Sequence, residues 1–160
     1  MNQLHDSAVL FCCMGNICRS PTAEGVFCKL HQELAPQLKL HVASIGTHDY
    51  HVSEAPGARA VLAAREQNID ISAHRGRVVT IDDFSSFDYI LAMDRVNLSR
   101  LQRMRPTTSR TDVRLLLKFV EGCAIKEVPD PYYGGPSGFE RVLDLVKQGR
   151  EHGPARTPLP

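Results

Sequence analysis

The chain has 160 residues, a net charge of +1 at neutral pH and a hydrophobic content of 42%. A chain of this size and composition is expected to fold as one globular domain with a sizeable core, and its charge gives no argument for binding nucleic acid or an anionic membrane. No apolar run approaches the roughly 20 residues of a membrane span and no signal peptide is seen, so we expect a cytoplasmic protein.

The first predicted elements are a buried strand and a helix, joined by a short loop. Residues 8–12 form a short apolar run without alternation, which is typical of a strand buried on both faces of a parallel sheet. The helix is predicted to start near Pro21, to run to about Leu34 and to end before Pro36.

Further strands and helices alternate along the middle of the chain. We predict strands over 38–44 and 89–93, helices over 58–67 and 96–104, and one helical turn at 81–84. Residues 113–120 are apolar and ambiguous between strand and short helix, and we favour a strand to about Lys118. This alternation predicts an α/β fold around a parallel sheet.

The C-terminal part is predicted to contain a loop, a last helix and a tail. Residues 129–136 include three prolines and two glycines and therefore form a loop. The last helix is predicted to begin after Ser137 and to end at Gly149. We expect a single domain over residues 1–150 and a flexible tail over residues 151–160.

The loop Cys-Met-Gly-Asn-Ile-Cys-Arg-Ser at residues 13–20 is the strongest functional signal. A strand, a loop with glycine and a helix N-terminus make an anion site, because backbone N–H groups point inward and the helix dipole favours negative charge. Cys13 is the candidate nucleophile, and Arg19 and the Ser20 hydroxyl favour its reactive thiolate. The planar fork of Arg19 can also clamp two phosphate oxygens, so the loop predicts phosphate-ester chemistry.

A general acid must protonate the leaving group of such a reaction. Asp130 is the best candidate, because its loop is rigid and follows a predicted strand. Cys13, Ser44, Asp94 and Asp130 all follow predicted strands, and ligands of parallel sheets bind at the carboxyl ends of the strands. An Asp-Pro pair alone is more often a turn, but beside a loop of this kind we favour the catalytic interpretation.

The five cysteines do not suggest a disulfide framework or a metal site. An odd count argues against a secreted disulfide-bonded protein, and Cys13 and Cys18 have no second spaced pair with which to hold zinc. Cys12, Cys28 and Cys123 are expected to be small buried residues. We expect neither a metal nor a cofactor.

Residues 7 to about 148 resemble the low-molecular-weight protein tyrosine phosphatases. The resemblance rests on the stretches 13–21, 44–47, 87–94 and 130–134, and on their order and spacing. It implies a three-layer α-β-α fold with a four-stranded parallel sheet in the order 2-1-3-4. It also implies metal-independent hydrolysis of phosphotyrosine in proteins through a phosphocysteine. We further expect a monomer or weak homodimer that binds neither nucleic acid nor membrane.

The resemblance assigns roles to individual residues. The catalytic residues are Cys13 as nucleophile, Arg19 as phosphate clamp and Asp130 as general acid and base. The rest of the phosphate loop comprises Met14, Gly15, Asn16, Ile17, Cys18 and Ser20. The loop is supported by Asn16, which takes a left-handed conformation, and by Ser44, His74 and Asp94. The pocket is a deep slot for phosphotyrosine walled by Tyr50, Tyr132 and Tyr133.

Several alternatives stay open at this stage. Cys18 is either a redox partner that forms a reversible disulfide with Cys13 or a packed thiol. An arsenate reductase on the same fold would need two further relay cysteines, and Cys28 and Cys123 form no nearby pair. An arginine-phosphate phosphatase tends to carry threonine where Ile17 stands. A non-catalytic phosphate-binding module would not need Cys13, Arg19 and Asp130 together.

Overall fold

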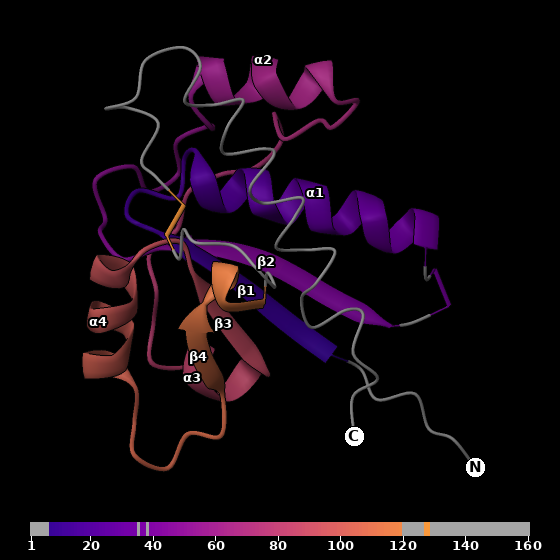
Figure 1. Cartoon of the computed structure of the whole chain (residues 1–160). Coiled ribbons are helices and arrows are strands. Elements are labelled where there is room, and N and C mark those ends of the chain that lie inside the picture. Colours follow the sequence, from indigo (N-terminus) through magenta and orange to yellow (C-terminus); the bar gives the residue numbers. More distant parts are fainter. Residues whose placement is uncertain (1–6, 35, 38, 120–126, 129–160) are drawn as a thin grey trace.

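The computed structural model describes residues 7–34, 36–37, 39–119 and 127–128 (Figure 1). The predicted C-terminal helix from Ser137 to Gly149 and the predicted tail lie outside the described residues.

Strands and helices alternate along the described chain, as the sequence pattern predicts. The elements are β1 (Ser7–Cys13), α1 (Arg19–Leu34), β2 (Leu40–Gly46), α2 (Ala58–Glu66), α3 (Asp83–Ser86), β3 (Tyr89–Ala92), α4 (Arg95–Met104) and β4 (Asp112–Leu115). The four strands form one parallel sheet in the order β2-β1-β3-β4, which confirms the predicted topology. No helix within the described ranges has the length and apolar character needed to cross a bilayer.

The prediction of a strand as far as Lys118 is wrong at its C-terminal end. Strand β4 stops at Leu115, and a 3₁₀ helix covers Leu116–Phe119. Leu115 packs on one face of the sheet, whereas Leu116 and Leu117 both pack into the core on the other face. A strand would send these last two side chains to opposite faces, so a helical turn is required to bury both together.

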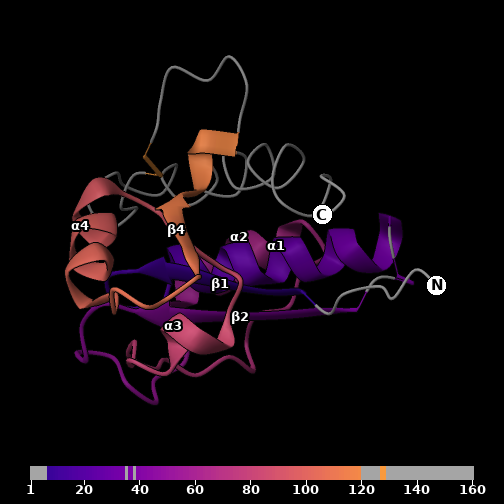
Figure 2. The ribbon, with the colours of Figure 1, turned by 90° about the horizontal axis from the view of Figure 1, so that it is seen from below.

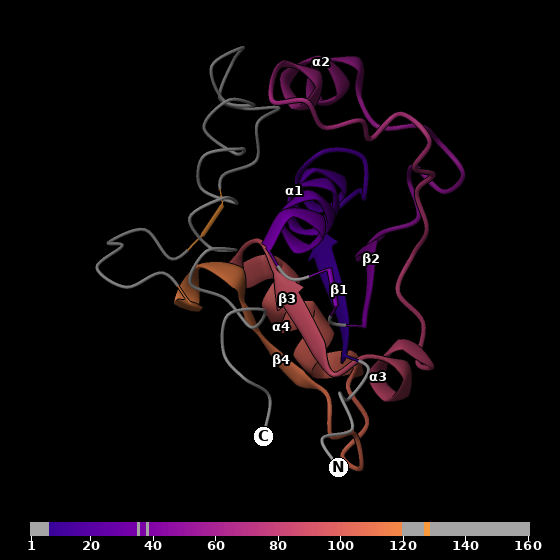
Figure 3. The ribbon, with the colours of Figure 1, turned by 90° about the vertical axis from the view of Figure 1, so that its right-hand side faces the viewer.

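Alternate residues of the central strand β1 build two separate cores. Val9, Phe11 and Cys13 face the core under α1 and α2, while Leu10 and Cys12 face the core that contains Phe84 of α3 and Leu101 of α4. Figures 2 and 3 show α1 and α3 on opposite sides of the sheet. The resulting α-β-α arrangement is the predicted three-layer fold, and the two cores bury β1 on both faces.

The strand register brings the carboxyl ends of β1, β2 and β3 to one edge of the sheet. Cys13 pairs with Gly46 of β2, and Cys12 pairs with Ala92 of β3. A segment far along the chain reaches the same edge, because the Val128 N–H donates to the Met93 carbonyl at 2.7 Å. Functional residues from four parts of the sequence therefore meet there.

Candidate active site

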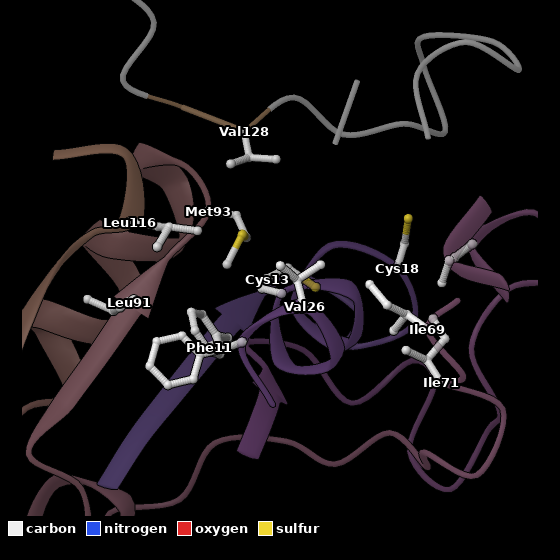
Figure 4. Packing of buried hydrophobic residues seen from close by; sticks show 14 of the residues in the cluster. Phe11, Cys13, Cys18, Val26, Ile69, Ile71, Leu91, Met93, Leu116 and Val128 are labelled. Atoms are coloured by element: carbon white, nitrogen blue, oxygen red, sulfur yellow. The ribbon is translucent and has the colours of Figure 1, made fainter. Parts of the chain in front are cut away.

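Cys13 stands where β1 ends and the loop to α1 begins. Its side chain is buried, at 3% exposure, and lies in the core cluster of Figure 4. The Asn16 N–H donates to Cys13 Sγ at 3.3 Å, and Ser20 Oγ lies 3.0 Å from the same sulfur. Because α1 begins at Arg19, the sulfur faces a helix N-terminus as well as these donors. This environment stabilises a negative charge on or beside the sulfur.

The neighbouring Cys12 has a different environment. It is fully buried on the other face of the sheet, and its thiol contacts the Cys13 carbonyl at 3.6 Å. Burial raises the pKa of Cys12 well above its ordinary value, and the nearby charges of Cys13 and Asp94 add to the effect. Cys12 is therefore a neutral core thiol, and Cys13 alone of the two is placed for chemistry.

Asn16 connects the loop to the parts of the chain that surround it. Its φ of 58° confirms the left-handed conformation that the family resemblance implies. Its Nδ2 donates to Ser20 Oγ at 2.8 Å and to Ser44 Oγ at 3.0 Å. Its Oδ1 accepts the Arg77 N–H at 2.9 Å and lies 3.2 Å from His74 Nε2. Ser44 and His74 are therefore brought to Asn16 as expected, whereas no sequence signal indicated the main-chain contact from Arg77.

Arg19 is held from two directions. Its Nη1 donates to Asp94 Oδ2 at 2.7 Å and to the Val128 carbonyl at 3.0 Å, and the side chain is almost fully buried. The other oxygen of Asp94 caps α4 by accepting the Asn97 N–H at 2.8 Å. Asp94 thus fixes Arg19 relative to the sheet. The sequence indicated Asp94, but it gave no signal for the Val128 carbonyl, because a backbone acceptor carries no residue signature.

The segment after β2 runs closely along the loop. The Thr47 N–H donates to the Cys13 carbonyl at 2.9 Å and the His48 N–H to the Met14 carbonyl at 3.1 Å. A side chain at Gly46 would place its Cβ only 2.8 Å from the Met14 carbonyl oxygen. Glycine is therefore required here for the two backbones to approach each other.

Only part of the predicted pocket wall lies within the described residues. Tyr50 is 68% exposed, and its ring stacks on His48 with centroids 5.3 Å apart. Tyr132, Tyr133 and Asp130 lie outside the described residues. Tyr50 therefore stands on the segment that borders the loop, while the depth of the slot stays a prediction.

Ile17 and Cys18 occupy the second half of the loop. Both are buried, at 6% and 5% exposure, and Cys18 belongs to the same core cluster as Ile69 and Ile71 (Figure 4).

Across the described part of the chain, no group of three histidine, cysteine or acidic side chains is arranged to hold a metal ion.

Comparisons with known proteins identify relatives over almost the whole chain. The family model described as "Low molecular weight phosphotyrosine protein phosphatase" matches residues 8–152. A low molecular weight protein-tyrosine-phosphatase of Bacillus subtilis is 37% identical over 144 residues, which span 90% of this chain and 91% of the relative.

Two solved structures show how far the similarity extends in three dimensions. A protein tyrosine phosphatase from Entamoeba histolytica has a TM-score of 0.86 and 36% identity, and the match covers 91% of this chain and 93% of that one. A Drosophila arginine phosphatase has a TM-score of 0.84 and 30% identity, with 90% and 93% covered. The shared fold therefore accommodates phosphatases named for two different phosphorylated residues.

Proposed function

The chain belongs to the low molecular weight phosphotyrosine protein phosphatase family, and from this premise we propose that it hydrolyses phosphotyrosine in proteins through a covalent intermediate on Cys13. The observation that carries the assignment of the nucleophile is the position of Cys13 Sγ. The sulfur lies within 3.3 Å of the Asn16 N–H nitrogen and 3.0 Å of Ser20 Oγ, at the N-terminus of α1.

In the first step the Cys13 thiolate attacks phosphorus. The S–P bond forms as the P–O bond to the tyrosine ring breaks, and the leaving oxygen takes a proton from Asp130. The loop N–H groups and the guanidinium of Arg19 bind the three equatorial phosphoryl oxygens, over which the negative charge is spread in the transition state. Because Asp94 and the Val128 carbonyl hold Nη1, Arg19 is oriented before the substrate arrives.

In the second step water replaces the cysteine on phosphorus. Asp130, now a carboxylate, takes a proton from the water as its oxygen attacks phosphorus. The S–P bond breaks, the sulfur leaves as a thiolate, and inorganic phosphate is released. The hydroxyl of Ser20 stabilises the departing thiolate from 3.0 Å.

Chain connectivity supports the assignment of Asp130. Val128 is tied to the site by its N–H, which binds the Met93 carbonyl, and by its carbonyl, which binds Arg19. Asp130 follows two residues later in the sequence, so the assignment puts the general acid directly after a segment that is anchored at the site.

We expect replacement of Asp130 by alanine to slow the first step according to the leaving group. Turnover of phenyl phosphate should fall far more than turnover of p-nitrophenyl phosphate, since the better leaving group needs less protonation. An Asp82→Ala variant is the matched control, because Asp82 is an exposed residue at the start of α3. Equal losses on the two substrates in Asp130→Ala would contradict the role as general acid.

Substrate class is the test that separates this function from its nearest alternative. The arginine phosphatase relative makes phosphoarginine the second candidate substrate. Ile17 argues against it, because isoleucine is bulkier than the threonine that arginine-phosphate phosphatases tend to carry at this loop position and should exclude the planar guanidinium phosphate. We expect hydrolysis of phosphotyrosine peptides in the presence of a metal chelator, with little hydrolysis of phosphoserine or phosphoarginine peptides. Preference for phosphoarginine would overturn the assignment.

Three further expectations go with this proposal. Tyr50, Tyr132 and Tyr133 wall a slot deep enough to exclude phosphoserine. The protein acts in the cytoplasm as a monomer or weak homodimer.

Peroxide converts Cys13 to a sulfenic acid, which the Cys18 thiol attacks to form a disulfide and release water. Recovery of activity by a dithiol after peroxide treatment, lost in Cys18→Ala, tests the last point.

A further inference from the structure

Positive charge is concentrated in α4 and in the loop that follows it. Residues 95–111 contain five arginines and no acidic residue. The whole chain has 19 lysines and arginines and 18 acidic residues, so the remainder of the chain carries more acidic than basic groups. The near-zero net charge therefore conceals a local basic region.

The helical period places three of these arginines on the side of α4 that points away from the sheet. Asn97 and Leu101 are the buried residues of this helix, and Leu101 packs into the core that covers the sheet. Arg95, Arg100 and Arg103 are exposed. At 3.6 residues per turn they lie within an arc of about 140° on the opposite side of the helix. Their charges therefore share one solvent-facing surface.

An apolar side chain lies among these charges. Val96 falls within the same arc, and its 71% exposure is the largest of any large hydrophobic residue in the described part of the chain. We call Arg95, Val96, Arg100 and Arg103 together the α4 face. Arginine is enriched in protein interfaces, so cations around an exposed apolar side chain are typical of a surface that binds a partner.

The arginines of the α4 face differ from others nearby in having no structural partner. Arg105 donates to the carbonyls of Ser109 at 2.8 Å and Thr111 at 3.2 Å, and Arg114 pairs with Asp112. Both therefore hold the chain around β4 in place. None of the three guanidinium groups of the α4 face forms a hydrogen bond or ion pair with a residue that the structure describes.

The helix itself gains little from these charges. Arg95 is the first residue of α4, where the helix dipole disfavours a cation. The dipole favours Arg103 in the last turn, but Arg100 lies three positions before it, a spacing at which like charges repel each other. Neither helix formation nor core packing accounts for the α4 face.

The α4 face begins next to the phosphate clamp. Asp94, the residue before Arg95, binds Arg19 at 2.7 Å, and the Glu127 carboxylate accepts the Arg95 N–H at 2.7 Å. Both acids at the start of the helix are thus already engaged. From this end α4 returns toward the start of β4 (Figure 1), and at 1.5 Å per residue the face extends about 12 Å to Arg103. An extended peptide spans this length with about four residues.

We propose that the α4 face is a docking surface for an acidic segment of the phosphoprotein substrate, whose carboxylates bind Arg95, Arg100 and Arg103. The proposal rests on the function proposed above and adds a substrate preference to it. Guanidinium groups bind carboxylates as planar forks, and an apolar residue of the segment covers Val96. A substrate held at Arg19 has its neighbouring residues within reach of this face. Attraction between exposed charges accelerates the encounter, so the preference lies mainly in KM.

Two pairs of phosphotyrosine peptides test the preference in the whole protein. The peptides of a pair differ only in a tract of about four residues, aspartate in one and asparagine in the other, which lies N-terminal to the phosphotyrosine in one pair and C-terminal in the other. At low ionic strength we expect kcat/KM to be about tenfold higher for the aspartate peptide in at least one pair. The preference should disappear in about 1 M salt, because exposed charges are screened. Equal kcat/KM within both pairs would overturn the proposal.

A charge-matched pair of double variants locates the preference. Arg100→Gln combined with Arg103→Gln should reduce it to about twofold, while turnover of p-nitrophenyl phosphate, which is too small to reach these residues, stays unchanged. Glutamine is a good helix former, so α4 is retained. Arg59→Gln combined with Arg65→Gln removes the same charge from exposed positions of α2 and should keep the wild-type preference. An undiminished preference in the α4 variant, or an equal loss in both variants, would overturn the proposal.

Two further measurements separate the remaining outcomes. Binding to phosphatidylserine vesicles that the α4 variant loses, together with no preference between the peptides, would assign the face to an anionic membrane and overturn substrate docking. If the wild type hydrolysed none of the peptides, the proposed function would fail instead. Binding of the same peptides to Cys13→Ser, measured by fluorescence anisotropy, would then decide on the α4 face by itself: tighter binding of an aspartate peptide supports it, and equal binding overturns it.

Discussion

Replacement of Cys13 by serine is expected to reduce the turnover of p-nitrophenyl phosphate by at least about 10,000-fold while leaving the protein folded. A serine hydroxyl is nearly isosteric with the thiol, so the contacts with Ser20 and with the Asn16 N–H can be retained. The hydroxyl is far less acidic, however, and the two neighbouring donors cannot supply the general base that a serine nucleophile needs. Phosphate should therefore still bind to the loop, and the loss should appear in kcat.

Cys12→Ala provides the matched control for this variant. Cys12 is the adjacent residue, but its thiol is buried on the opposite face of the sheet and lies outside the loop. Removal of one sulfur from the core should lower the free energy of unfolding by about 1–2 kcal/mol without changing kcat more than a few-fold. If Cys13→Ser retained turnover, or if Cys12→Ala abolished it, the assignment of the nucleophile would be wrong.

Replacement of Arg19 by lysine is expected to lower kcat by about 1,000-fold, although the positive charge is conserved. The guanidinium is a planar fork whose Nη1 is fixed by Asp94 and the Val128 carbonyl. An ammonium group that pairs with Asp94 can no longer present two parallel N–H groups to the phosphoryl oxygens. The difference should be larger for kcat than for the affinity of inorganic phosphate, because the oriented fork matches the three equatorial oxygens of the transition state better than the oxygens of a tetrahedral phosphate.

The same substitution at Arg114 is the control. Arg114 also forms a paired contact with an aspartate, Asp112, with Nε to Oδ1 at 2.8 Å. This pair belongs to β4, whose first residue is Asp112, and lies away from the phosphate loop. Arg114→Lys should keep kcat within a few-fold of the wild type. A comparable loss in both variants would mean that the effect of Arg19→Lys comes from a general loss of stability.

The sequence predicts those parts of the site that are local in the chain. Cys13, Arg19 and Ser20 fall within eight residues between a strand and a helix, so the pattern of residue types defines their geometry. The parallel sheet then follows from alternating elements, and with it the meeting of the ends of β1, β2 and β3. The left-handed Asn16 was anticipated only through the family resemblance, since asparagine tolerates this conformation without requiring it.

The contacts that are distant in sequence and made by the backbone were not predictable. The Val128 carbonyl binds Arg19 and the Arg77 N–H binds Asn16. Every residue type offers the carbonyl and every type except proline offers the N–H, so neither contact has a residue signature. The approach of Glu24 to His74 was not predictable either, because the two residues lie 50 positions apart and Glu24 looks like an ordinary helix residue. The end of β4 was misjudged because three consecutive leucines fit a buried strand and a buried helical turn equally well.

Detection of the phosphorylated enzyme tests the central claim most directly. Enzyme with Asp130 replaced by alanine should accumulate the intermediate, because the second step lacks its general base. We expect a denaturing quench during turnover of p-nitrophenyl phosphate to yield a single phosphoryl group attached to Cys13 Sγ, identified by phosphorus NMR and by mass spectrometry of the Cys13 peptide. Turnover with no phosphoryl group on Cys13, or with the group on another side chain, would contradict hydrolysis through a phosphocysteine.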